Sequence, residues 1–240
     1  MLIKGLNKTT LLDYPGRVAA TIFTGGCNFR CPFCHNGDLV LKPSIQDAYS
    51  EEEVLSFLQK RKNVLKGVCI TGGEPTLQAD LPVFMEKVKK IGYDIKLDTN
   101  GYQPQVLAEL IGDGLVDYVA MDIKNSKEKY PETAGLNDLQ IEKIEESVEL
   151  LAGAIIPYEF RTTVVKELHT MEDILSIGKW IAGCPNFFLQ SYAENEKEIR
   201  RMQEDIITPF HAYEKDEMEE IIKRLEEIPG MKGKVLLRGM

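Results

Sequence analysis

The sequence has few of the residues that mark secreted or nucleic-acid-binding proteins. Only 5 of its 240 residues are cysteine, a low and odd number that argues against a disulfide framework and indicates a reducing compartment. Lysine and arginine (29) are outnumbered by aspartate and glutamate (38), which disfavours nucleic acid and anionic membranes as partners. Neither a secretory leader nor a run of roughly 18 apolar residues is evident. We therefore expect a cytoplasmic protein that binds neither membranes nor nucleic acid.

The composition suits one globular domain. Hydrophobic residues make up 43% of the chain, enough for a buried core and too many for intrinsic disorder. No low-complexity segment interrupts the chain. We predict a single domain over residues 1–240.

Short apolar runs alternate with amphipathic stretches along the chain. The runs predict strands at residues 17–24, 67–71, 93–97, 116–123, 155–165, 187–190 and 234–238. The stretches predict helices at residues 50–62, 81–91, 104–111, 139–151, 171–182 and 215–228. About six successive strand–helix units predict an α/β fold with a parallel sheet, either doubly wound or barrel-like.

Polar residues follow four of the predicted strands. The strand ends read TGGC (24–27), TGGE (71–74), DTNG (98–101) and DIK (122–124). Because both kinds of fold bind ligands at the carboxyl ends of parallel strands, we expect these residues to converge on one site. Asp122 and Lys124 are two residues apart on a strand, so their side chains point to the same side. They form either a structural ion pair or a pair of ligand-binding groups.

Three of the five cysteines lie in one loop. Residues 25–36 read GGCNFRCPFCHN, which places Cys27, Cys31 and Cys34 at the spacing C-x3-C-x2-C. Thiolates are soft ligands for iron–sulfur clusters, zinc or copper(I). A structural zinc ion takes four protein ligands, and His35 directly follows Cys34, a poor position for the fourth. Residues 31–35 also match the C-x-x-C-H haem attachment motif, which leaves Cys27 unexplained.

A cluster held by three cysteines has one open metal position. Electron-transfer 4Fe-4S clusters use four cysteines. Three leave one iron able to bind a substrate or cofactor, by the logic that separates catalytic from structural zinc. The triplet therefore predicts chemistry rather than electron storage alone.

The cysteine loop, with Phe33 before its last cysteine, resembles that of the radical S-adenosylmethionine (SAM) enzymes. The resemblance implies a partial (β/α)6 TIM-like barrel with parallel strands. It also implies a 4Fe-4S cluster on Cys27, Cys31 and Cys34 whose open iron binds the methionine part of SAM. Reductive cleavage then yields methionine and a 5′-deoxyadenosyl radical, which the protein must position and protect.

The resemblance also assigns roles to residues outside the triplet. It implies a cofactor-binding set of Phe33, His35, Gly72, Gly73, Glu74, Asp98, Asp122 and Lys124. It makes Lys124 and Arg161 catalytic, although a charge inside an apolar strand such as Arg161 can equally form a core salt bridge. A monovalent cation is implied at Asp98, Thr99 and Asp122, whose oxygen atoms suit a hard cation.

Within that family the chain is similar to activating proteins of glycyl radical enzymes. The DTNG and D-x-K stretches occur there in this order, and the DYPG segment (13–16) resembles the activating proteins of anaerobic ribonucleoside-triphosphate reductases. This implies an oxidoreductase that abstracts hydrogen from a glycine of such a reductase, with a flavodoxin- or ferredoxin-like electron donor. Pyruvate formate-lyase activators carry Pro-Tyr-His where this chain has Ser191-Tyr-Ala193, and their histidine lies near the cofactor.

Other functions stay open at this point. They are activation of another glycyl radical enzyme, including the pyruvate formate-lyase type, radical SAM chemistry on a small molecule, and non-catalytic binding of a metal or haem. Of the remaining residues, we expect His169 and His211 at the surface and Cys69 and Cys184 as buried, small hydrophobic residues.

Overall fold

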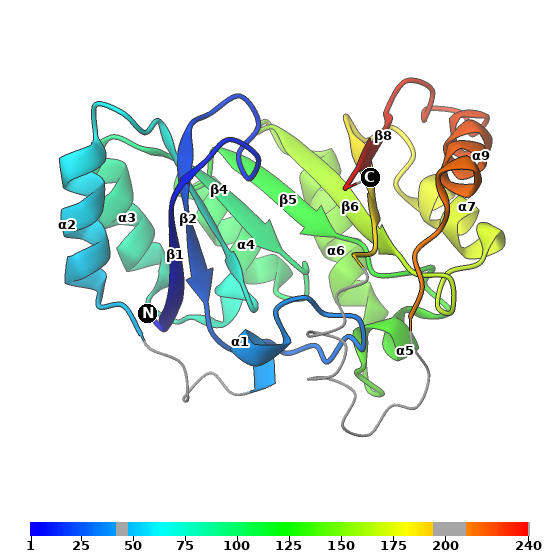
Figure 1. Cartoon of the computed structure of the whole chain (residues 1–240), viewed down its shortest axis with the longest axis horizontal. Helices are drawn as coiled ribbons and strands as arrows, with labels where there is room; N and C mark the ends of the chain where they lie inside the picture. Colours follow the sequence, from blue (N-terminus) through cyan, green and yellow to red (C-terminus); the bar gives the residue numbers. More distant parts are fainter. Residues whose placement is uncertain (42–47, 194–209, 240) are drawn as a thin grey trace. The chain divides into compact units, whose positions relative to one another are not determined.

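The computed structural model describes residues 1–41, 48–193 and 210–239 (Figure 1). The chain divides into two compact units. Unit 1 takes its described residues from Met1–Asn28, Asp38–Ala120 and Ala154–Pro157. Unit 2 takes them from Phe29–Gly37, Met121–Gly153 and Tyr158–Met240. The single domain expected over residues 1–240 stays a prediction.

Unit 1 contains the first strands and the helices between them. Its strands are β1 (Ile3–Thr10), β2 (Ala19–Thr24), β3 (Gly67–Gly72) and β4 (Asp94–Thr99). Its helices are α2 (Glu51–Arg61), the 3-10 helix η1 (Pro75–Leu77), α3 (Leu81–Ile91) and α4 (Pro104–Gly112). Two elements are shared with unit 2: α1 (Gly37–Leu41) and β5 (Tyr118–Asp122).

Unit 2 contains the later strands and helices. Its strands are β6 (Tyr158–Val164), β7 (Phe187–Ser191) and β8 (Val235–Arg238). Its helices are α5 (Tyr130–Ala134), α6 (Ile141–Ala152), α7 (Met171–Trp180) and α9 (Lys215–Glu226). The helices α7 and α9 lie side by side (Figure 1).

The strands follow one another in the sheet in the order of the sequence, from β1 to β8. β1 runs antiparallel to β2, whereas β2–β3, β3–β4, β6–β7 and β7–β8 are parallel pairs. Parallel neighbours in sequence order follow from successive crossover helices, which all return the chain in the same direction. The predicted α/β class with parallel strands is confirmed.

Local sequence explains where several elements begin and end. The α2 helix begins with a capping box, in which the Ser50 hydroxyl accepts from the Glu53 backbone and the Glu53 carboxylate accepts from the Ser50 backbone. The α3 helix has a proline in its first turn and ends at Gly92, whose φ of 105° suits a glycine. Ser50 therefore marks the start of α2, and Gly92 marks the turn from α3 into β4.

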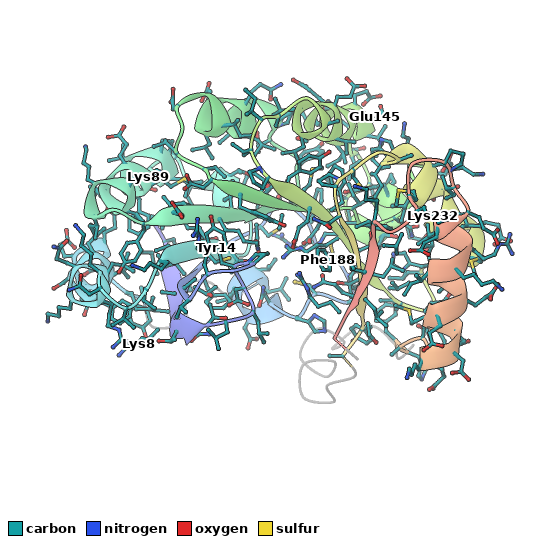
Figure 2. The ribbon with its side chains drawn as sticks, turned by 90° about the horizontal axis from the view of Figure 1, so that it is seen from above. Lys8, Tyr14, Lys89, Glu145, Phe188 and Lys232 are labelled. Atoms are coloured by element: carbon teal, nitrogen blue, oxygen red, sulfur yellow. The ribbon has the colours of Figure 1, made fainter. Side chains whose placement is uncertain are left out.

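The DYPG segment has a packing role in unit 1. Tyr14 (Figure 2) is buried, and a Cβ atom added to Gly67 would lie 2.6 Å from its Cδ1 atom. The Tyr14 ring also lies 6.0 Å from the ring of Tyr118. The Tyr14 ring therefore packs against Gly67 at the start of β3. Any larger residue at position 67 would clash with this ring.

Every predicted strand and helix is present, with ends that differ by a few residues. The sequence did not predict β1, α1, α5 or the short 3-10 helix η1. The β1 strand was missed because its sequence, IKGLNKTT, lacks a run of apolar residues, and residues 7–9 are exposed. In the described part of the chain, no helix has the length and apolar character needed to cross a bilayer.

Candidate functional site

The glycine pair after β3 packs its backbone against the loop that follows β2. The amide of Gly73 donates to the Thr24 carbonyl at 2.9 Å, and the amide of Glu74 donates to the Gly26 carbonyl at 2.8 Å. A Cβ atom on Gly73 would lie 1.9 Å from the Gly26 oxygen, and Gly72 has a φ of +111°. The pair is therefore required for this close approach.

The Glu74 carboxylate joins the ends of β3 and β4. It is 1% exposed. Its Oε1 atom accepts from the Thr76 amide (3.1 Å), the Thr76 hydroxyl (2.6 Å) and the Thr99 hydroxyl (2.8 Å). Its Oε2 atom accepts from the Asn100 amide at 2.7 Å. Four donors surround one buried carboxylate, so Glu74 holds the DTNG turn against the GGE turn.

The pKa of Glu74 reflects this burial. Burial raises the pKa above the ordinary value of a glutamate, although the hydrogen bonds from Thr76, Asn100 and Thr99 act in the opposite direction. A raised pKa means that the folded state binds a proton more readily than the unfolded state. Glu74 therefore stabilises the fold most at low pH, and this contribution is lost as the pH rises through its folded-state pKa.

Asn100 extends the same network to the first cysteine. Its side-chain amide donates to Oδ1 of Asn28 at 2.8 Å and to Sγ of Cys27 at 3.8 Å. Cys27 is half-buried. Hydrogen bonds to a cysteine sulfur stabilise its thiolate and tune a cluster bound to it. Asn100 was not singled out from the sequence, although it belongs to the DTNG stretch.

Asp98 is paired with a lysine of the same strand. Lys96 on β4 is almost fully buried, and its ammonium forms an ion pair with Oδ1 of Asp98. Cys69, the register partner of Lys96 on β3, has its sulfur 3.9 Å from the Lys96 nitrogen and 3.7 Å from Oδ1 of Asp98. Cys69 and Cys184 are buried, as predicted. The sequence did not indicate that Lys96 is buried.

In unit 2 the part of the cysteine loop that contains Arg30 and Cys31 contacts the end of α5 and the glycine that follows it. The Arg30 amide donates to the Ala134 carbonyl at 2.8 Å. The Cys31 sulfur lies 3.9 Å from the same oxygen. A Cβ atom on Gly135 would lie 2.3 Å from the Arg30 oxygen. The Cys34 amide donates to the Cys31 carbonyl at 3.1 Å, which forms a turn between the two cysteines.

Asp122 lies between two cations of unit 2. Its Oδ2 atom is 3.0 Å from Nζ of Lys124, and its Oδ1 atom is 2.8 Å from Nε of Arg161. Burial acts to lower the pKa of Lys124, but Asp122 and a Cys31 thiolate outweigh it, and the pKa rises. Lys124 therefore keeps its positive charge. The predicted proximity of Asp122 and Lys124 is confirmed, and Arg161 joins them.

Aromatic contacts hold the last residues of the cysteine loop. His35 stacks on Tyr192 with ring centroids 5.4 Å apart. Phe33 meets His169 edge to face at 6.2 Å. The expectation of a surface His169 is wrong, because this histidine is fully buried. Its Nδ1 atom accepts from the Val165 amide at 3.1 Å, and its Nε2 atom lies 2.8 Å from the Lys124 carbonyl. Local sequence gave no hint of this burial, which depends on residues far along the chain. Burial lowers the pKa of His169, so its ring stays neutral.

Unit 2 contains a buried acidic residue, Glu159, that the sequence analysis did not predict. Glu159 on β6 is fully buried, and its Oε1 atom lies 3.3 Å from Nη1 of Arg238 on β8. The Arg238 guanidinium also lies 3.9 Å above the ring of Phe188 on β7 (Figure 2). The pair and the stacking contact tie the last three strands together.

The chemistry of the cysteines fits an iron–sulfur cluster. Cys27, Cys31 and Cys34 form no disulfide in the described residues, and their thiols are the donors that such a cluster requires. Cys27 belongs to unit 1 and the other two to unit 2. In the residues that the structure describes, no three side chains of histidine, cysteine, aspartate or glutamate are grouped so as to hold a metal ion. The cluster on these three cysteines thus stays a prediction from donor type and spacing.

Comparison with known proteins identifies the family. The sequence matches the model of the radical SAM superfamily over residues 21–181. The chain belongs to this superfamily. This radical SAM protein is 33% identical over 199 residues to a Methanocaldococcus jannaschii protein named "Putative glycyl-radical enzyme activating enzyme", and the match covers 80% of each chain. It is 31% identical over 168 residues to a "Probable GTP 3',8-cyclase" of Thermococcus kodakarensis, which covers 68% of this chain and 53% of the cyclase.

Solved structures show the same fold. Streptococcus suis SuiB bound to SAM superposes with a TM-score of 0.65 at 13% identity, over 89% of this radical SAM protein and 48% of SuiB. The predicted radical SAM fold is confirmed. At this identity the likeness extends to the fold and not to the substrate.

We expect Gly73→Ala to destabilise unit 1, because its methyl group overlaps the Gly26 carbonyl. The free energy of unfolding in urea should fall by about 2–4 kcal/mol. Gly112→Ala is the matched control, since a Cβ atom there meets nothing within 4 Å. An unchanged stability of the Gly73 variant would contradict the close approach of the two loops.

We expect Glu74→Gln to destabilise the protein by about 1–3 kcal/mol, because its amide brings two N–H donors toward groups that already donate, whereas a protonated carboxyl brings only one O–H. The loss relative to the native protein should be largest at low pH and shrink as the pH rises through the folded-state pKa of Glu74. Urea unfolding at several pH values measures both the loss of stability and its dependence on pH. Glu86→Gln removes only an exposed ion pair with Lys90 on α3 and should lower stability by at most about 0.5 kcal/mol. A loss that grows with pH would show that the pKa is lowered.

Proposed function

We propose that this protein is an activase that cleaves SAM reductively and generates a glycyl radical on a partner enzyme. The observation that carries the proposal is the 33% identity, over most of both chains, to the named activating enzyme of Methanocaldococcus jannaschii. The C-x3-C-x2-C loop supports it, because three cysteines leave an open iron. The five cysteines form no disulfide in the described structure, which suits a reducing cytoplasm.

In this proposal Cys27, Cys31 and Cys34 hold the 4Fe-4S cluster. When bound, the cluster supplies the electron that divides SAM into methionine and a 5′-deoxyadenosyl radical, the species that takes a hydrogen atom from glycine. Asn100 orients Cys27 through its hydrogen bond to the sulfur. The contact of Cys31 with Ala134 places the second thiol beside α5.

The proposed SAM site uses residues from the ends of several strands. Lys124 keeps its positive charge beside Asp122 and can bind the SAM carboxylate. Gly72 and Gly73 bring backbone atoms close to the cysteine loop, while the buried Glu74 acts by positioning Asn100 and Thr99. The other proposed contacts are Phe33, His35, Asp98 and Asp122.

The proposed partner is an anaerobic ribonucleoside-triphosphate reductase, with a flavodoxin- or ferredoxin-like electron donor. The DYPG segment and the residues around the cysteines support this choice. Ala193 stands where pyruvate formate-lyase activators have a histidine, which makes that lyase the weaker candidate. Arg161 lies against Asp122, where it can orient the carboxylate during the reaction.

A second candidate is a radical SAM enzyme that acts on a small molecule. The observation that favours it is the 31% identity to the GTP cyclase of Thermococcus kodakarensis, although the match covers only 53% of that protein. The two candidates share the cofactor and differ in the acceptor of the radical.

We expect anaerobically reconstituted protein to form 5′-deoxyadenosine from SAM on reduction with dithionite. Cys27→Ala, Cys31→Ala and Cys34→Ala should each lose the broad visible absorption of the cluster and the product. Cys184→Ala is the matched control, because Cys184 is a buried cysteine outside the loop. A tightly bound zinc ion, or a cluster that forms without these cysteines, would contradict the proposal.

We expect a glycyl radical signal in electron paramagnetic resonance spectra when the reduced protein and SAM are mixed with an anaerobic reductase. Exchange of the reactive glycine of the reductase for alanine should remove the signal, because the radical resides on that α-carbon. A signal with a different glycyl radical enzyme, and none with the reductase, would reassign the partner. Consumption of GTP without any glycyl radical would favour the second candidate.

A further inference from the structure

The cation that the family resemblance implies would need oxygen atoms that are available to bind it. Its proposed ligands are Asp98, Thr99 and Asp122. A monovalent cation is held by several oxygen atoms whose charge it offsets. Each of these three side chains already has polar or charged partners in the structure.

Asp98 is already neutralised by a cation of its own strand. Lys96 and Asp98 point to the same face of β4, and the ammonium is ion-paired with Oδ1 of Asp98. The Lys96 side chain is 2% exposed and the Asp98 side chain 13%. A buried ammonium without a carboxylate is strongly disfavoured, so the pair is a fixed part of unit 1. The sum of the two charges is zero, which leaves no negative charge to attract another cation.

The Thr99 hydroxyl is engaged on two sides. It donates to Oε1 of Glu74 at 2.8 Å and accepts from the Gly101 amide at 3.1 Å. Its proton points to the carboxylate, and one lone pair faces the Gly101 amide. To bind a cation, Thr99 would have to give up contacts that hold the DTNG turn.

Asp122 is flanked by two positive charges in unit 2. Lys124 lies at its Oδ2 atom and Arg161 at its Oδ1 atom. Each oxygen of this carboxylate thus already has a cation beside it, and a further cation would meet the like charges of Lys124 and Arg161. The donor set implied by the resemblance therefore does not fit a monovalent ion.

We propose that the Lys96 ammonium takes the place of the monovalent cation, so that this protein binds SAM without K⁺ or Na⁺. The part of this proposal that concerns SAM rests on the proposed function. Lys96 is a positioning residue, because it acts through Asp98 and not on the reacting atoms. Its ammonium keeps Asp98 oriented and its charge balanced, as a bound cation otherwise would.

The first test compares SAM binding in different salts. The reconstituted protein is titrated calorimetrically with SAM in KCl, NaCl or tetramethylammonium chloride. The ionic strength is about 0.1 M in each salt, so that electrostatic screening is the same, with a Debye length of about 10 Å. Tetramethylammonium is too large and too weakly coordinating to enter a site made of protein oxygens. We expect dissociation constants that agree within about twofold. Binding at least about tenfold tighter in K⁺ or Na⁺ would overturn the proposal.

The second test removes the built-in charge. Lys96→Met keeps the length of the side chain and leaves Asp98 without its ammonium. We expect SAM to bind this variant at least about tenfold more weakly in tetramethylammonium chloride, and K⁺ or Na⁺ to restore much of the loss. Lys89→Met is the matched control, because Lys89 (Figure 2) forms an ion pair with Asp117 of unit 1 at 2.7 Å. A folded Lys96 variant whose loss no cation restores would contradict the proposal.

A third measurement does not depend on SAM. A cation that binds the folded state raises the melting temperature. We expect the same melting temperature for the native protein in all three salts, and a higher one for Lys96→Met in K⁺ or Na⁺ than in tetramethylammonium. If the protein binds no SAM, the proposed function fails, while this series still decides the role of Lys96. If Lys96→Met does not fold, the melting temperatures of the native protein in the three salts decide alone. A melting temperature that is raised only by K⁺ or Na⁺ would overturn the proposal.

Discussion

The buried carboxylate of Glu74 is the constraint on which the candidate site of unit 1 depends. It accepts hydrogen bonds from two turns that follow different strands, and its own backbone amide donates to the loop that leads to Cys27. Three strand ends are thereby fixed to one another by one residue, through its carboxylate and its backbone amide. Moving this carboxylate into the interior is costly, and its donors offset only part of that cost, because its pKa stays raised. The geometry of the three loops and the ionisation of Glu74 are therefore linked.

The candidate site residues of unit 2 include two positively charged side chains, whereas those of unit 1 are held by the buried carboxylate of Glu74. Lys124 and Arg161 both contact Asp122, so a positive group remains in excess beside the carboxylate. Lys124 also lies close enough to Cys31 for a thiolate there to influence its charge. A surplus of positive charge favours anionic groups such as thiolates and carboxylates. The cysteine loop passes through both units in sequence, and each unit supports its part of the loop with different chemistry.

The sequence predicted those features that depend on spacing along the chain. The strand–helix alternation, the contact of Asp122 with Lys124 and the burial of Cys69 all follow from local patterns. It did not predict the burial of Lys96, because a charged residue in a short strand is as consistent with an exposed edge as with a core. The burial of His169 was missed for the same reason, since it depends on residues brought together only by the fold.

The contact between Gly73 and Gly26 limits how the cysteine loop can be transferred to other proteins. The two backbones touch at a point where a single methyl group has no room. A designer who grafts residues 25–36 onto another parallel sheet would also have to transplant the glycine pair of the adjacent strand. The smallest portable module is consequently a pair of neighbouring loops.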